Sequence, residues 1–501
     1  MRGQLPLDNG QFRLYQIAHR AANAAANEHF DIGMSHAPLE HATVMVDLTP
    51  LLPGGGNGGA KWFVLALLSE MGERRARWRW LLLTTAANDA LLGEALPSMA
   101  RLSVLDEHGR ALLRPDPTAL PGGGRADLLY CPFTAPFYAR PAVPTVATVY
   151  DLQFIEYPQF FSRAEVEERA ANFFRAAAVA DRLVCISDYV RDQVCRATGL
   201  DESWVRRVHI SLPDRLGPVD RAALPALLAR HGLARQRYLI YPANTWLHKN
   251  HDMLLTAAGM YFARHPTSDL KIVCCGVSDD ARGRALKAAA RRMGLGERVI
   301  FAGFLAEGEL AGLLAAARAL IFPSLFEGFG MPLLEAMAEG VPVLSANTTS
   351  LPEIAGDAAL LFDPRRPGDI LSAIETIEEE PQVALRLADA GRARAVELGN
   401  AATMAEAYLG LFDDIIAEQR RLLGPFRRRL GLARRELWRA LAGGVRDFAR
   451  TTCLRLYARI RRAPAWLWGR VQLMRVFLGG RLPQLRALAR RLRRALSGGK
   501  S

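Results

Sequence analysis

Residues 322–340, "FPSLFEGFGMPLLEAMAEG", follow an apolar run and contain a Gly-Phe-Gly turn. After the turn, apolar residues recur at helical spacing. Pro332 stands where a helix would begin, a position that proline favours because its missing N–H is not needed there. Gly340 stands where that helix would stop. The stretch therefore predicts a strand, a glycine loop and a helix in immediate succession.

The same alternation extends in both directions from this stretch. Short apolar runs, most of them followed by helical patterns, predict strands at 42–52, 78–85, 127–133, 145–151, 182–187, 205–211, 237–243, 270–277, 298–304, 319–324 and 341–347. Strands that alternate with helices form parallel sheets. The predicted fold class is α/β, with two Rossmann-like domains facing a cleft and a basic helical C-terminal extension.

The length of 501 residues is too great for one hydrophobic core. Residues 1–40 are predicted to be an N-terminal extension. The first Rossmann-like domain is placed at 41–215 and the second at 216–419. Residues 420–501 are predicted to form a basic amphipathic helical tail.

The net charge of +13 is concentrated in this tail, which contains 23 Lys and Arg residues and only two acids. Leucines at helical spacing and three tryptophans accompany the arginines, and such helices typically lie in an anionic membrane surface. Two alternatives are a helical appendage packed on the body and a partly disordered tail. Nucleic-acid binding is not favoured, because no recognition motif accompanies the charge.

The cellular compartment is inferred from cysteines and apolar runs. Six cysteines show no CxxC pair and are interpreted as buried thiols of a reducing compartment. No apolar run reaches the roughly 18 residues of a membrane-spanning helix, and the first 20 residues lack a secretory core. We therefore expect a cytoplasmic protein, peripheral at the inner face of the cell membrane.

Two carboxylates in the opening stretch, Glu327 and Glu335, indicate the chemistry. Backbone amides around Phe329–Leu334 would face a ligand at the end of the strand, and helix starts favour phosphate. Carboxylates repel phosphate but accept hydrogen bonds from hydroxyl groups. A nucleotide sugar matches this pattern, because a hexose and a ribose flank its diphosphate.

Residues 326–343 contain Glu, seven residues and Glu within "FEGFG-P-LEAMA-G-PV", and "LPEIAGDAALLFDP" follows at 351–364. With "RYLIYPANTWLHKNHDMLL" at 237–255, these motifs resemble the retaining family-4 glycosyltransferases, which have the two-domain GT-B fold. The resemblance extends over residues 42–419 and is strongest in the second half. It implies that the first domain binds the acceptor and the second the nucleotide sugar.

The resemblance implies a role for individual residues. Glu327 would hold the transferred sugar, Glu335 the ribose, and Lys249 the diphosphate. Further donor-binding candidates are Asn244, Gly303, Phe304, Phe329, Gly330, Met331 and Leu334. The first-domain candidates are Gly58 and Gly59 in a glycine loop, and Tyr150 and Asp151, which we count with Glu327 as catalytic.

Two departures from the family pattern concern the donor site. Asn244 stands where family members often have an arginine, and Tyr150 stands where they often have a histidine before the aspartate. We expect neither a metal nor another cofactor, because the chain has no Asp-x-Asp motif and His248 and His251 offer only two ligands. The resemblance implies retention through attack on the same face of the sugar.

The resemblance therefore implies a retaining hexosyltransferase of surface polysaccharide assembly, acting on a glycan or lipid-linked acceptor. The loop at 241–251 is similar to that of bacterial mannosyl- and rhamnosyltransferases, which favours GDP-mannose as donor. The alternatives are another GT-B enzyme, such as a sugar-nucleotide epimerase or phosphorylase, and a non-catalytic scaffold tethered to a membrane.

Overall fold

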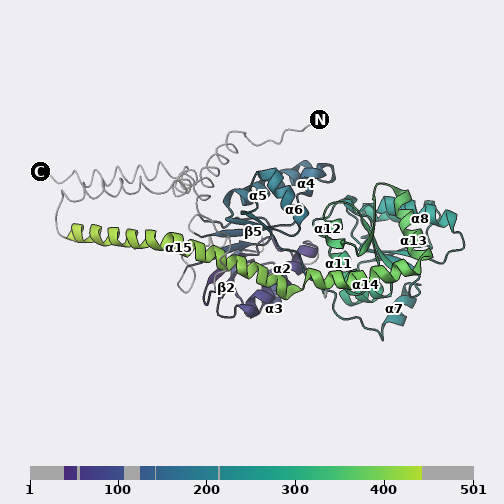
Figure 1. Ribbon diagram of the computed structural model, residues 1–501, viewed down its shortest axis with the longest axis horizontal. Helices are drawn as coiled ribbons and strands as arrows, with labels where there is room; N and C mark the ends of the chain where they lie inside the picture. The colour runs from purple at the N-terminus through teal and green to yellow at the C-terminus, as the bar shows by residue number, and fades with distance from the viewer. Residues whose placement is uncertain (1–38, 54–56, 107–124, 141–142, 213–214, 443–501) are drawn as a thin grey trace. The chain divides into compact units, whose positions relative to one another are not determined.

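The computed structural model describes residues 39–53, 57–106, 125–140, 143–212 and 215–442, with side chains up to residue 421 (Figure 1). Residues Leu39–Phe412 form one compact unit. The predicted N-terminal extension, except for its last two residues, and most of the predicted tail lie outside the described residues.

The first domain, which we define as residues 39–212, is built on a parallel sheet with the strand order β3-β2-β1-β4-β5-β6-β7. Its strands are β1 (Thr43–Asp47), β2 (Arg79–Thr85), β3 (Ala100–Leu105), β4 (Leu128–Cys131), β5 (Thr145–Val149), β6 (Arg182–Cys185) and β7 (Val205–Arg207). β4 and β5 are buried along their whole length. Burial on both faces is typical of a parallel sheet covered by helices.

The second domain, residues 215–398, has the strand order β10-β9-β8-β11-β12-β13, again all parallel. Its strands are β8 (Tyr238–Pro242), β9 (Lys271–Cys275), β10 (Val299–Gly303), β11 (Ala319–Phe322), β12 (Val343–Ala346) and β13 (Ala359–Phe362). The direction of the strand order reverses between β8 and β11. Ligands of such sheets bind at this switch point, outside the carboxyl ends of the strands.

Helices gather around each sheet (Figure 1). The first domain contains α2 (Gly59–Arg74), α3 (Asp89–Ala95), α4 (Gln153–Glu156), α5 (Arg163–Val179) and α6 (Asp188–Thr198). The second contains α7 (Leu224–Arg230), α8 (His251–Arg264), α9 (Ala281–Arg292), α10 (Glu307–Ala316), α11 (Met331–Ala338), α12 (Leu351–Ala355), α13 (Pro367–Glu379) and α14 (Pro381–Leu398). The predicted α/β fold class with two Rossmann-like domains is confirmed.

Two strands, β3 and β13, were not expected from the sequence. Both lie at a sheet edge. β3 (ARLSVL) has only one fully buried residue, and β13 (ALLF) also has only one. A continuous apolar run marks a strand that is buried on both faces, so edge strands give a weaker signal.

The last described helix, α15 (Ala401–Ala442), begins by packing on the first domain. The rings of Tyr408 and Phe412 lie 5.6 and 5.3 Å from that of Tyr130 in β4. The Tyr408 hydroxyl also lies 3.0 Å from the Thr148 hydroxyl in β5. The start of α15 therefore belongs to the core of the first domain, although it follows the second domain in sequence. Among the described helices, none is both long enough and apolar enough to span a bilayer.

Candidate functional site

The loop that carries Glu327 runs from the end of β11 to the start of α11. Gly330 precedes the helix with φ 103°, a left-handed conformation that favours glycine. Pro332 lies in the first turn of α11, as predicted. It has no N–H, and the Leu333 N–H donates to the Gly330 carbonyl at 3.0 Å. Fewer amides of this turn are therefore available to a ligand than the sequence suggested.

Glu327 and Lys249 form an ion pair at the switch point between β8 and β11. Lys249 Nζ lies 2.6 Å from Glu327 Oε1, and the two side chains are 14% and 12% exposed. Lys249 Nζ also lies 5.6 Å from the centre of the Phe322 ring. The structure thus brings together two of the predicted site residues. The lysine assigned to phosphate is held by the acid assigned to the sugar.

Hydrogen bonds from the following segment hold the loop backbone. The Ser350 hydroxyl donates to the carbonyls of Glu327 (3.0 Å) and Phe329 (3.1 Å). The Glu327 N–H donates to the Thr349 hydroxyl at 3.1 Å. The side chain of Phe329 is itself buried, so this residue can offer only its backbone to a ligand. The same holds for the buried Leu334.

Glu335, assigned to the ribose, is 2% exposed and binds an arginine that the sequence did not reveal. Arg215 Nε lies 2.6 Å from Glu335 Oε1, and its Nη1 lies 3.5 Å from Glu307 Oε1. Arg215 belongs to the segment between the two sheets, 120 residues from Glu335. No motif or spacing in the sequence pointed to this contact.

The other donor-binding candidates follow the strands β8 and β10. The Asn244 side chain accepts a hydrogen bond from the Trp246 N–H (3.3 Å) and so shapes its own loop. Gly303 has φ 70°, and Phe304 next to it is 76% exposed. Trp246 is also exposed, at 57%. Two large aromatic rings are therefore accessible in the loops after β8 and β10.

The predicted residues of the first domain approach the Glu327 loop through their backbone. A Cβ atom at Gly328 would collide with the Tyr150 carbonyl oxygen, and one at Gly59 would collide with the Met331 side chain. Gly58 has φ 52°. At position 328 only glycine permits the close approach to the Tyr150 backbone, whereas at position 59 the clash is with the end of the flexible Met331 side chain.

The side chains of Tyr150 and Asp151 are held locally. The Tyr150 ring packs edge-on against Phe63 at 5.7 Å, and its buried hydroxyl has no hydrogen-bond partner among the described residues. Burial raises the pKa of this hydroxyl well above its usual value. Asp151 accepts a hydrogen bond from the Gln153 N–H (3.0 Å), and burial raises its pKa. The Tyr150 hydroxyl is therefore a buried, protonated group without a hydrogen-bond partner among the described residues.

Two histidines beside Lys249 are buried and neutral. Burial, reinforced by the charge of Lys249, lowers the pKa of His248 to about 4. Burial and then the charge of Arg282 lower the pKa of His251 to about 4. The ring of His251 packs on Tyr241 at 4.9 Å. Both side chains thus belong to the packing of the lysine loop.

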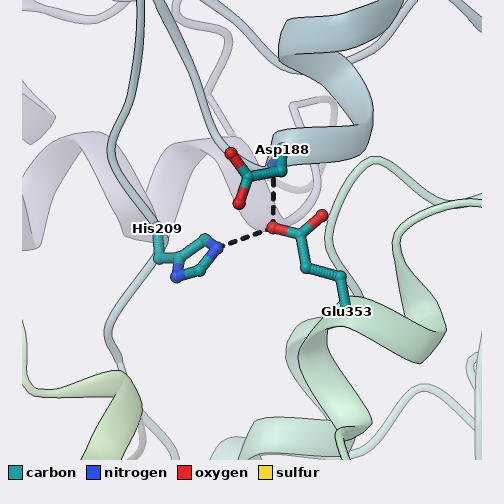
Figure 2. Close-up of side chains that lie close together, drawn as sticks. All are labelled: Asp188, His209 and Glu353. Atoms are coloured by element: carbon teal, nitrogen blue, oxygen red, sulfur yellow. Dashed lines mark hydrogen bonds and ion pairs between the residues drawn. The ribbon is translucent and has the colours of Figure 1, made fainter.

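A further cluster, Asp188, His209 and Glu353, was not predicted. Figure 2 shows His209 and the backbone of Asp188 directed at the Glu353 carboxylate. The possible ligand atoms of the three side chains lie within 4.8 Å of one another, a spacing that could hold a metal ion. However, one Glu353 oxygen accepts hydrogen bonds from the Asp188 N–H and His209 Nε2, each at 2.7 Å, and the other accepts from the Tyr189 N–H at 3.0 Å. The cluster is a hydrogen-bonded helix cap.

The second domain matches a known family. Residues 228–394 match the family model "Glycosyl transferases group 1". The chain is 28% identical over 378 residues to a D-inositol 3-phosphate glycosyltransferase of Rhodococcus opacus (strain B4), a match that covers 69% of this chain and 83% of that relative. It is 28% identical over 222 residues to an O-antigen chain mannosyltransferase B of Escherichia coli, covering 44% of this chain and 57% of that relative. This chain thus spans little more than half of the latter protein.

Solved structures share the fold. Anabaena HepE, crystallised with UDP and glucose, superimposes with a TM-score of 0.58 at 19% identity, covering 75% of this chain and all of HepE. WaaG, a glycosyltransferase involved in lipopolysaccharide biosynthesis, has a TM-score of 0.54 at 15% identity, covering 74% and 99% of the two chains. The predicted GT-B fold and the predicted resemblance to glycosyltransferases, with mannosyltransferases among the relatives, are confirmed.

Proposed function

We propose that this protein, which carries a glycosyl transferases group 1 domain in a GT-B fold, transfers a hexose from a nucleotide sugar to a glycan or lipid-linked acceptor in surface polysaccharide assembly. The observation that carries the proposal is the Lys249–Glu327 pair at the β8/β11 switch point. A cation for phosphate and an acceptor for hydroxyl groups lie side by side where ligands of such sheets bind.

On the donor side, Lys249 neutralises the diphosphate when it exchanges Glu327 for phosphate oxygens. Glu327 then accepts hydrogen bonds from hydroxyls of the transferred sugar, while Glu335 accepts from the ribose. The start of α11 adds a partial positive charge near the phosphates. Within the described residues, the second oxygen of Glu335 has no hydrogen-bond partner and remains available to a hydroxyl group.

The reaction breaks the bond between the anomeric carbon and the donor phosphate oxygen and forms a bond from that carbon to an acceptor oxygen. The acceptor proton moves to the departing phosphate. We favour attack on the same face and hence retention, because Glu327 is assigned to the hydroxyls of the transferred sugar and no other acid is assigned as a nucleophile. Lys249 and the start of α11 would stabilise the leaving group without a metal.

The relatives favour mannose among the hexoses. An O-antigen chain mannosyltransferase matches this chain, as do serotype-specific mannosyltransferases of Escherichia coli at 29% identity over 199 residues. GDP-mannose is therefore our proposed donor. We further propose that residues 420–501 attach the enzyme to the anionic inner face of the cell membrane through their 23 basic residues.

The experiment is a panel of nucleotide sugars tested for thermal stabilisation and for acceptor-dependent release of nucleoside diphosphate. We expect GDP-mannose to give both. Release that requires inorganic phosphate would indicate a phosphorylase, and an altered sugar still attached to its nucleotide would indicate an epimerase. Stabilisation without turnover by any donor and acceptor would support the scaffold alternative.

A further inference from the structure

Ser187 connects the first domain to the Glu327 loop. It is fully buried and precedes α6, where its hydroxyl accepts a hydrogen bond from the Val190 N–H at 3.2 Å. The same hydroxyl donates to the Gly328 carbonyl at 2.7 Å. One serine therefore caps a helix of the first domain and also binds the backbone carbonyl of the residue that follows Glu327.

The carbonyls of three consecutive loop residues are thus each held by a serine hydroxyl. Ser350 of the second domain holds those of Glu327 and Phe329, and Ser187 of the first domain holds that of Gly328 between them. Peptide planes anchored at three successive carbonyls have little freedom to rotate. The direction of the Glu327 side chain consequently depends on a group supplied by the other domain.

Glu353 provides the reciprocal contact from the second domain (Figure 2). It lies on α12, the helix that begins directly after Ser350. Its carboxylate accepts hydrogen bonds from the N–H groups of Asp188 and Tyr189 in the first turn of α6. A carboxylate at the positive end of a helix forms a favourable charge-assisted interaction. His209, which follows β7, adds a third hydrogen bond at 2.7 Å.

We propose that Ser187 and Glu353 are positioning residues that couple the docking of α6 on α12 to the reactive geometry of the Glu327 loop. The inference rests on the proposed transferase function. Docking brings Ser187 to the Gly328 carbonyl, so the donor site is complete only when the two domains are in contact. The Gly328 position, which leaves no room for a Cβ beside the Tyr150 carbonyl, is part of the same junction.

The test compares Ser187→Ala and Glu353→Gln with a matched capping variant, Ser162→Ala. Ser162 caps α5 of the same domain through the Glu165 N–H (3.3 Å), and its hydrogen bonds stay within that helix. We expect kcat to fall about 10- to 100-fold in Ser187→Ala and Glu353→Gln and to stay within twofold in Ser162→Ala. The Kd of nucleoside diphosphate should stay within about twofold, because Lys249 and α11 are intact.

Coupling between the two contacts is the second measurement. If they act through one docking event, the double variant should lose little more kcat than the stronger single variant. Ser187→Thr keeps the hydroxyl and should recover part of the lost activity. An unchanged kcat, a fully additive double variant, or a matching loss of nucleotide affinity would overturn the positioning role.

Wild-type turnover is measured first. A wild type inactive with every donor rejects the proposed function, whereas an active wild type with an equally active Ser187→Ala variant rejects only the positioning role. If Ser187→Ala does not fold, Glu353→Gln decides the question, because glutamine keeps the shape of the side chain but loses the charge and one of the two oxygens that accept from the first turn of α6. A Tm loss in Glu353→Gln no larger than that of Ser162→Ala, with a tenfold lower kcat, supports positioning.

Discussion

Glu327→Gln should separate nucleotide binding from transfer. Glutamine has nearly the same shape as glutamate but carries no charge, so it releases Lys249 from its ion pair. In the proposed mechanism, an incoming diphosphate competes with the Glu327 carboxylate for this ammonium group. The variant should therefore bind nucleoside diphosphate more tightly than wild type while losing transfer.

The size of the gain follows from the geometry of the pair. Two unit charges about 4 Å apart interact by about 4 kcal/mol at the effective dielectric constant of about 20 that suits partly buried pairs. Desolvation of both groups offsets much of this attraction, and each side chain keeps 12–14% exposure. A net of about 1–2 kcal/mol remains, which corresponds to about 5- to 30-fold in Kd.

Transfer should fall by about 10²- to 10³-fold, because the sugar loses the acceptor that orients it. Calorimetric titration with nucleoside diphosphate and single-turnover transfer measure the two effects separately. The matched control is Glu339→Gln, which removes an exposed acid just after α11 and should change neither quantity. In a Lys249→Met background the affinity gain should shrink, because no ammonium group is left to release. Weaker binding in Glu327→Gln, or retained transfer, would refute the assignment of this pair.

Three other predictions use different assays. Transfer to a soluble acceptor should survive EDTA, and a loss that Mn²⁺ or Mg²⁺ reverses would contradict the proposed metal independence. Burial raises the pKa of Asp47 to about 6 from 3.8, so the folded state holds a proton that the unfolded state releases, and stability falls as pH rises between these values. The free energy of unfolding of Asp47→Asn, measured with urea relative to wild type, should therefore be up to about 3 kcal/mol higher at pH 7 than at pH 4. A difference between the two proteins that does not change with pH would contradict this. Truncation at about residue 420 should abolish binding to anionic vesicles and spare transfer to a soluble acceptor, whereas an unfolded truncation would favour a packed appendage.

The sequence predicted those features of the site that lie within one continuous stretch. Glu327, Gly330 and Pro332 fall where the strand, loop and helix pattern placed them. The apolar runs of the buried strands located every central strand of the two sheets, because burial on both faces requires uninterrupted apolar residues. The edge strands β3 and β13 are short or partly exposed and gave no comparable signal.

Contacts between residues that lie far apart in the sequence could not be predicted. Arg215 meets Glu335 across 120 residues, and Ser187 meets Gly328 across 141. A single arginine or serine has many possible partners, and only the fold selects one. The return of α15 to the first domain through Tyr408 was missed for the same reason, since its helical pattern does not identify the surface on which it packs.

The charge balance of the donor site explains why these long-range contacts matter. Lys249 is compensated by Glu327, and Arg215 lies between Glu335 and Glu307. In the proposed mechanism, a diphosphate entering this site meets cations that already have partners, so binding requires an exchange of ion pairs. An exchanged pair contributes only the difference between two favourable contacts, so we expect a moderate nucleotide affinity and release of the product when Glu327 recaptures Lys249. Orientation of the Glu327 loop must then supply specificity that charge alone does not, and Ser187 and Ser350 hold that loop from the two domains.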